Sequence, residues 1–236
     1  MPDPAPSRRF LLSLTGLWSL LVILAPMATV SLPPSSQASM PSSTNGVTSS
    51  VEQPRIVAFG DSLTAGLGVG PAESYPAQLQ QRLDELGYHY RVVNAGVSGE
   101  TTAGGARRVA WVLKSRPVIV ILELGANDGL RGLNPEQTQA NLERIIQQLQ
   151  QAKVTVVLAG MKLPPNYGVE YTRAFESIYP ALARRYHLEL IPFFLDGVAG
   201  SIKLNQPDGI HPTAEGYRII VGKILEAVQP LLKKWK

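Results

Sequence analysis

The sequence predicts an α/β fold in which helices cover both faces of a parallel sheet of about five strands. Two observations carry this prediction. Short, nearly continuous aliphatic runs alternate along the chain with longer amphipathic stretches, as in strand–helix units whose strands are buried on both faces. The first three of these runs end in loops rich in Gly, Asn, Asp or Ser. With right-handed crossovers, the pattern indicates a flavodoxin-like, doubly wound sheet, whose strand order the sequence leaves open.

Each element has its own local signal. The expected strands are short runs rich in β-branched and aliphatic residues, at 56–59, 90–93, 118–122, 154–158 and 188–193. The expected helices show apolar residues at helical spacing, at about 74–86, 102–115, 134–152, 169–186 and 213–232. Gly87 ends the first of these helices, and Asn134 with Pro135 begins the third.

Composition sets limits on function. The chain has 236 residues, enough for one domain of about 180 residues with an N-terminal appendage. It has no cysteine, which excludes disulfides, thiolate zinc sites and a cysteine nucleophile. The formal charge is +4, but much of the excess lies at residues 233–236. No basic stripe is interleaved with aromatic residues, so we expect no nucleic-acid partner.

The N-terminal part is predicted to be separate from the domain. Arg8 and Arg9 precede an apolar run to about residue 30, which is typical of an export signal and close to the ~20 residues that span a bilayer. Residues 1–30 are therefore expected to be a cleaved signal peptide or an uncleaved membrane anchor, and either would export the domain to the periplasm or another extracytoplasmic space. Residues 31–53, rich in Ser and Pro, are expected to be a linker, and residues 54–236 form the domain.

The turn at residues 60–66 is the first candidate for chemistry. Ser62 follows the carboxyl end of the first expected strand, where open α/β sheets bind their ligands. Gly60 allows a sharp turn at a place where a side chain would clash. Because Gly, Asp and Ser are also common in ordinary turns, this segment alone leaves both interpretations open.

A serine hydroxyl needs a general base to become a nucleophile, and the chain has three histidines. His89 precedes a strand and His187 ends a helix, where a cation suits the helix dipole. His211 alone lies in a loop bounded by Gly and Pro at the expected ligand edge. Asp208, three residues earlier, can bond the imidazole and hold its tautomer. The alternative is a turn-forming Asp and a histidine near a helix cap.

Taken together, these segments resemble the SGNH (GDSL) hydrolase family over nearly the whole domain. The matching blocks stand in the family's order: Gly60-Asp61-Ser62-Leu63, Asn94 with Gly99, Gly125-Ala126-Asn127-Asp128, and Asp208-Gly209-Ile210-His211-Pro212. The longer segments 60–66, 123–132, 163–168 and 177–180 are similar to the bacterial periplasmic thioesterase, lysophospholipase and arylesterase branch. The family's spacing selects Gly99 rather than Gly96 in the second block.

The resemblance implies the SGNH hydrolase fold and a role for each block. Ser62 would attack an ester or thioester carbonyl, His211 would take and return the proton, and Asp208 would orient His211. The backbone N–H groups of Ser62 and Gly99 and the side chain of Asn127 would hold the oxyanion. The path would run through an acyl-serine with no metal and no cofactor. Three other carboxylates, Asp61, Glu123 and Asp128, are expected to be structural.

Loops around the serine are expected to build the acyl pocket. The expected lining residues are Leu63, Leu67, the segment 99–104, Leu130 and the loop 161–168, with Leu163 and Pro164 presenting apolar surface next to the site. Such a surface suits an acyl chain better than a sugar. The first hypothesis is a broad esterase acting on acyl esters and thioesters, including lysophospholipids, with no partner protein implied. The alternatives are a carbohydrate O-deacetylase on the same scaffold and a non-catalytic envelope module that binds acylated ligands.

Overall fold

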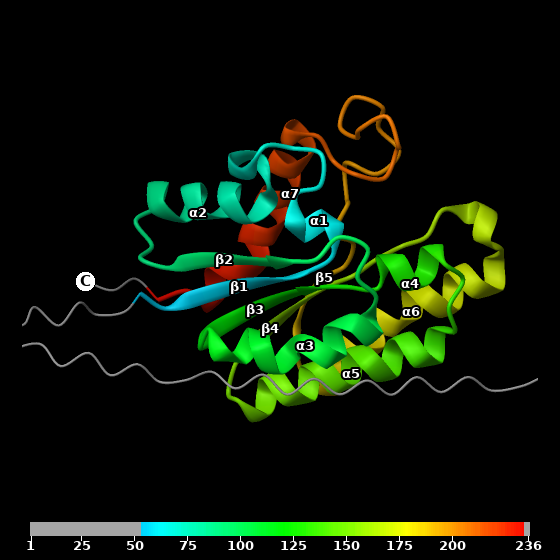
Figure 1. Cartoon of the computed structure of the whole chain (residues 1–236), viewed down its shortest axis with the longest axis horizontal. Helices are drawn as coiled ribbons and strands as arrows, with labels where there is room; N and C mark the ends of the chain where they lie inside the picture. Colours follow the sequence, from blue (N-terminus) through cyan, green and yellow to red (C-terminus); the bar gives the residue numbers. More distant parts are fainter. Residues whose placement is uncertain (1–52, 234–236) are drawn as a thin grey trace, which may run out of the picture. The chain divides into compact units, whose positions relative to one another are not determined.

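The computed structural model describes residues 53–233 and contains one parallel sheet of five strands in the order β2-β1-β3-β4-β5 (Figure 1). The strands are β1 (Arg55–Gly60), β2 (Arg91–Gly96), β3 (Pro117–Glu123), β4 (Thr155–Ala159) and β5 (Glu189–Ile191). All four neighbouring pairs are parallel. This is the flavodoxin-like order, and the expected α/β fold with about five parallel strands is confirmed.

The two central strands are apolar because both of their faces are covered. Ala58 of β1 lies opposite Asn94 of β2 on one side and Ile121 of β3 on the other. Residues 56–59 of β1 and 119–122 of β3 are at most 3% exposed. A continuous apolar run at these positions is what a strand between two helical layers requires.

Helices cover the sheet in two layers. The helices are α1 (Ser62–Ala65), α2 (Tyr75–Glu85), α3 (Thr102–Lys114), α4 (Ala126–Leu130), α5 (Pro135–Gln151), α6 (Val169–Tyr186) and α7 (Ala214–Val228). Three short 3₁₀ turns lie at Pro71–Glu73, Pro165–Tyr167 and Gln229–Leu231. Helices α2 and α7 pack together on one face, and α3 packs against α5, which also contacts α6, on the other (Figure 1).

Several boundaries differ from the prediction. Asn94, expected in a loop, lies in β2, because the pairing with β1 continues to Gly96 opposite Gly60. β5 is shorter than the expected run 188–193 because its pairing with β4 ends at Ile191 and Pro192 offers no N–H to a ladder. The last helix stops at Val228 and gives way to a 3₁₀ turn containing Pro230.

Two short helices occupy segments that were expected to be turns. α1 begins directly at Ser62, with the Asp61 carboxylate accepting the Leu63 N–H at 3.0 Å. α4 begins at Ala126, after Gly125 in the left-handed region at φ 117°. Helices of four and five residues carry too few side chains to show a helical period. The polar residues of these two segments therefore predicted turns and not helices.

The strand order creates a switch point between β1 and β3. The chain leaves β1 toward β2 on one side and later continues from β3 toward β4 on the other. The loops that follow β1 and β3 therefore diverge and leave a crevice at the carboxyl edge of the sheet. Gly60 is required there, since a Cβ atom would lie 2.1 Å from Thr64 Oγ1 and 2.5 Å from the Glu123 carbonyl oxygen.

The expected signal peptide or anchor at 1–30 and nearly all of the expected linker at 31–53 lie outside the described residues. Among residues 53–233, no helix combines the length and apolar character needed to cross a membrane.

Candidate active site

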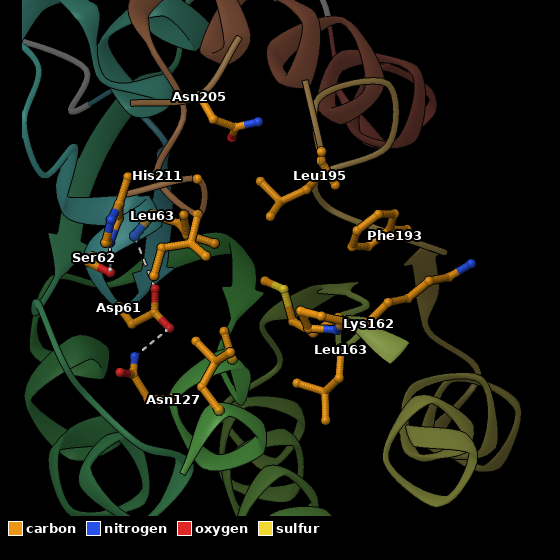
Figure 2. Close-up of a pocket in the computed structure, with 18 of the residues that line it drawn as sticks. Asp61, Ser62, Leu63, Asn127, Lys162, Leu163, Phe193, Leu195, Asn205 and His211 are labelled. Carbon is orange, nitrogen blue, oxygen red and sulfur yellow. Dashed lines mark hydrogen bonds between the residues drawn. The ribbon is translucent and has the colours of Figure 1, made fainter. Parts of the chain in front are cut away.

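Ser62 stands at the end of β1 as the first residue of α1, and its side chain faces His211 (Figure 2). The His211 Nε2 atom lies 2.9 Å from the Ser62 Oγ atom. Ser62 is 8% exposed, so its hydroxyl lies at the floor of the crevice and not on the outer surface. Residues 149 positions apart in the chain are thus brought within hydrogen-bond distance, as a nucleophile and its base require.

Asp208 holds His211 from the other side. Its Oδ2 atom lies 2.7 Å from His211 Nδ1, and its Oδ1 atom accepts the backbone N–H groups of Ile210 and His211, each at 3.0 Å. An imidazole that donates its Nδ1–H to a carboxylate presents the lone pair of Nε2 to the serine. The geometry therefore allows proton transfer from Ser62 to His211.

The Asp208 carboxyl is charged, and 46% of its side chain is exposed to solvent. Desolvation acts to raise the pKa of Asp208, but the hydrogen bonds from the His211 ring and from the two backbone N–H groups outweigh it and lower the pKa to about 2. A carboxylate that is ionised across the ordinary pH range can stabilise the imidazolium formed when His211 accepts a proton.

Gln206 fastens the loop that carries Asp208 and His211. Its backbone N–H donates to the His211 carbonyl at 2.7 Å. Its side-chain amide donates to the carbonyls of Leu67 at 2.7 Å and of Pro212 at 3.0 Å. The contact with Leu67 joins this loop to the segment that follows α1, and so holds the histidine loop against the serine turn. Gln206 was not predicted from the sequence, because a glutamine in a loop carries no pattern of its own.

Gly99 and Asn127 lie at the same crevice, in the loop after β2 and on α4. Gly99 has a φ of 77°, in the left-handed region that favours glycine. Asn127 Nδ2 donates to Asp61 Oδ2 at 3.0 Å (Figure 2). One of the two N–H bonds of this amide is thereby engaged, and the other is available to a bound oxygen.

Two buried carboxyls lie beneath the serine turn. Burial raises the pKa of Asp61 to about 6, against the opposing effect of the N–H donors of Leu63 and Asn127. Burial, followed by the charge of Asp61, raises the pKa of Glu123 well above its usual range. Glu123 Oε2 accepts the Thr64 hydroxyl at 2.7 Å. These bonds hold the turn in place, in agreement with the structural roles expected for both residues.

Asp128, the third carboxylate expected to be structural, is buried and bonds Thr102 of α3. Its Oδ2 atom accepts the Thr102 backbone N–H at 2.8 Å, and its Oδ1 atom accepts the Thr102 hydroxyl at 2.5 Å. The carboxylate therefore ties the first residue of α3 to α4. Among residues 53–233, no group of three or more His, Cys, Asp or Glu side chains is placed to hold a metal ion.

A pocket of about 680 Å³ opens beside Ser62 (Figure 2). All four residues expected to bind substrate contribute to its lining: Leu63, Leu130, Leu163 and Pro164. Leu67, Gly99 and residues 161–165 line it, but residues 100–104 and 166–168, expected to do so, do not. The chain turns away after Gly99 into α3, whose first residue Thr102 is buried against Asp128.

One wall of the pocket was missed in the sequence analysis. It comes from the segment after β5, which contributes Phe193, Leu195, Ala199 and Gly200. Figure 2 shows Phe193 and Leu195 across the cavity from Ser62. The signal was the apolar Phe193-Phe194-Leu195 run, which continues past the end of the strand. The result is a mainly apolar cavity with Ser62, His211 and Asn127 on one side of it (Figure 2). Its remaining polar lining comes from Asp61, Lys162, Glu176 and Asn205. A mainly apolar lining with a few polar groups is common in small-molecule sites.

Comparisons with known proteins agree with this geometry. The family model described as GDSL-like Lipase/Acylhydrolase family matches residues 58–219. The chain is 43% identical over 178 residues to Esterase TesA of Pseudomonas aeruginosa, covering 75% of this chain and 89% of that protein. It is 38% identical over 178 residues to Thioesterase 1/protease 1/lysophospholipase L1 of Escherichia coli K12, covering 75% and 84%.

Solved structures show the same similarity. The crystal structure of TesA matches with a TM-score of 0.73 and 42% identity, covering 75% of this chain and 99% of that one. The crystal structure of AlinE4, described as an SGNH-hydrolase family esterase, matches with a TM-score of 0.65 and 47% identity, covering 77% and 98%.

Proposed function

The chain belongs to the GDSL-like lipase/acylhydrolase family and is a serine ester hydrolase, and from this premise we propose that Ser62, His211 and Asp208 perform the hydrolysis. The observation that supports the assignment most is the continuous contact from Asp208 through His211 to Ser62, at 2.7 Å and 2.9 Å. A nucleophile, its base and a group that orients the base are then in line.

The reaction proceeds in two halves. Ser62 Oγ attacks the acyl carbon while His211 Nε2 takes the hydroxyl proton. The tetrahedral intermediate collapses, the bond from the acyl carbon to the leaving oxygen or sulfur breaks, and His211 returns the proton to the leaving group. Water then attacks the acyl-serine with His211 again as base, which releases the carboxylic acid and restores Ser62.

Three donors hold the negative charge that develops on the carbonyl oxygen. These are the backbone N–H groups of Ser62 and Gly99 and the free N–H bond of the Asn127 side chain. Gly99 and Asn127 line the same pocket as Ser62, and Asp61 orients the Asn127 amide at 3.0 Å. Donors fixed in this way before the reaction lower the barrier because they need not reorganise as the charge appears.

The pocket favours acyl chains as substrates. Its lining is mainly aliphatic and aromatic and includes Leu63, Leu130, Leu163, Phe193 and Leu195. Burying each CH₂ of a chain in such surroundings contributes about 0.8 kcal/mol, whereas sugar hydroxyls would need hydrogen-bond partners that these side chains lack. We therefore place the substrates among acyl esters and thioesters of the arylesterase, acyl-thioesterase or lysophospholipase type.

Acyl-chain preference tests this assignment. We expect kcat/KM for p-nitrophenyl esters to rise from acetate to medium-chain esters, because each added methylene is buried in the pocket. The series from acetate to palmitate is measured with the purified chain, and the Ser62→Ala variant serves as the blank. Activity confined to acetate would contradict the acyl-chain assignment and favour a carbohydrate O-deacetylase. Absence of all Ser62-dependent activity, with a folded protein, would favour a non-catalytic module that binds acylated ligands.

We also propose that the chain is exported and acts in the periplasm or another extracytoplasmic space. The support is the Arg8-Arg9 pair and the apolar run to about residue 30. Fractionation of expressing cells, followed by intact-mass measurement, tests it. Export with loss of about 30 residues would indicate a signal peptide, and export at full mass in the membrane fraction would indicate an anchor. Full-length protein in the cytoplasmic fraction would contradict export.

A further inference from the structure

We propose that Arg131 is a positioning residue that holds the two halves of the oxyanion site together, an inference that rests on the proposed function. Gly99 lies in the loop after β2, and Asn127 lies on the short helix after β3. These two segments are far apart in the chain, so the backbone alone does not fix the distance between the two donors. A hydrogen-bonded oxyanion requires both donors within a few tenths of an ångström of their working positions. A group that contacts both segments could supply this constraint.

Arg131 makes both contacts with one nitrogen atom. Its Nη2 atom donates to the Gly99 carbonyl at 3.0 Å and to Asn127 Oδ1 at 3.4 Å. The backbone of Arg131 caps α4 through a bond from its N–H to the Asn127 carbonyl at 3.2 Å. Arg131 therefore follows directly after the helix that carries Asn127, and its guanidinium reaches across to the loop that carries Gly99.

The same contact fixes the orientation of the Asn127 amide. Arg131 donates to its oxygen, while Asp61 accepts from its nitrogen at 3.0 Å. A rotation of the amide by 180° would place its oxygen against the Asp61 carboxylate and its N–H groups against the guanidinium, and both contacts would be lost. With the amide held at both ends, its free N–H bond stays available to the oxyanion. A cation on the oxygen also polarises the amide and strengthens its N–H donors.

The contact with Gly99 acts on the second donor. Gly99 has a φ of 77°, a conformation that glycine adopts without penalty but that no side chain of its own stabilises. A Cβ at this position would have Arg131 Nη2 as its nearest neighbour, at 3.6 Å. Arg131 is not among the residues that line the pocket, and its guanidinium bonds Gly99 and Asn127. We therefore assign its effect to the positions of these two residues.

The Arg131→Ala variant tests the inference. We expect kcat for a p-nitrophenyl ester to fall about tenfold, a fraction of the ~10²–10³ that follows the removal of one oxyanion donor, with KM changed less than about twofold. Affinity for an alkylboronic acid, which forms a tetrahedral adduct on serine, should fall by a similar factor. Arg144→Ala removes an exposed arginine of α5 and should leave both quantities unchanged. Arg131→Lys keeps a charged donor and should recover part of the loss.

A double-mutant cycle separates positioning from a general structural effect. In the Asn127→Ala background, the loss caused by Arg131→Ala should shrink to about threefold or less. The inference would be overturned by a kcat equal to that of Arg144→Ala, by a loss that resides in KM, or by a full tenfold loss that persists without Asn127. These outcomes leave the proposed function intact, because that function is tested separately by the Ser62→Ala variant and the p-nitrophenyl ester series.

Discussion

Replacing Ser62 by alanine should lower kcat for ester hydrolysis by about 10⁵- to 10⁶-fold and leave the fold unchanged. The substitution removes the atom that forms the acyl bond, and alanine fits the space of the 8% exposed serine. Initial rates with a medium-chain p-nitrophenyl ester measure the loss, and thermal unfolding checks the fold. Ser177→Ala, which alters an exposed serine on α6, is the matched control and should retain full activity.

His211→Ala should give nearly the same loss, and the double variant should lose little more. The serine is a weak nucleophile without its base, and the base has nothing to activate without the serine, so the two residues act as a unit. A folded His211→Ala variant with more than about a tenth of the activity would show that another group takes the proton. Losses that multiply in the double variant would show that the two residues act separately.

Replacing Asn127 by alanine should cause the largest loss of kcat after the replacement of Ser62 or His211. We expect kcat to fall about 10²–10³-fold while KM changes little, because the amide faces a charge that exists only in the transition state. Steady-state kinetics with a medium-chain p-nitrophenyl ester separate the two parameters. Asn141→Ala, which removes an asparagine of α5 that bonds Thr102 and does not line the pocket, is the control.

A rise in KM alone would contradict the oxyanion role of Asn127 and indicate a contact with the ground state. The substitution also removes a hydrogen bond from Asp61. In the unaltered chain, the Asp61 Oδ2 atom accepts an N–H of the Asn127 side chain at 3.0 Å. Asn127→Asp serves as a comparison, because it keeps the shape, removes the donor and places a carboxyl against Asp61. It should lose at least as much activity as Asn127→Ala.

The central strands and the position of Ser62 could be predicted because their signals are local. A strand buried on both faces must be a continuous apolar run, and residues 56–59 and 118–122 are such runs. The end of each parallel strand lies at one edge of the sheet, so Ser62, Asn127 and His211 could be placed near one another without knowledge of strand order. The family resemblance, and not spacing, supplied the individual roles.

What the sequence did not reveal depends on contacts between distant segments. The wall formed by Phe193 and Leu195 was missed because it depends on where the chain turns after Pro192. The bond from Asn127 to Asp61 joins residues 66 positions apart, and no local pattern encodes it. The short helix α4 was expected to be a loop because five residues show no helical period. This helix carries Asn127 and is capped by Arg131.

Labelling with a fluorophosphonate, followed by peptide mass spectrometry, would identify the nucleophile itself. Such a reagent forms a covalent bond only with a serine that a base activates. We predict one adduct on Ser62 of the purified chain, blocked by a medium-chain ester and absent in His211→Ala. An adduct on another serine, or continued hydrolysis by a chain whose Ser62 is fully labelled, would show that Ser62 is not the nucleophile.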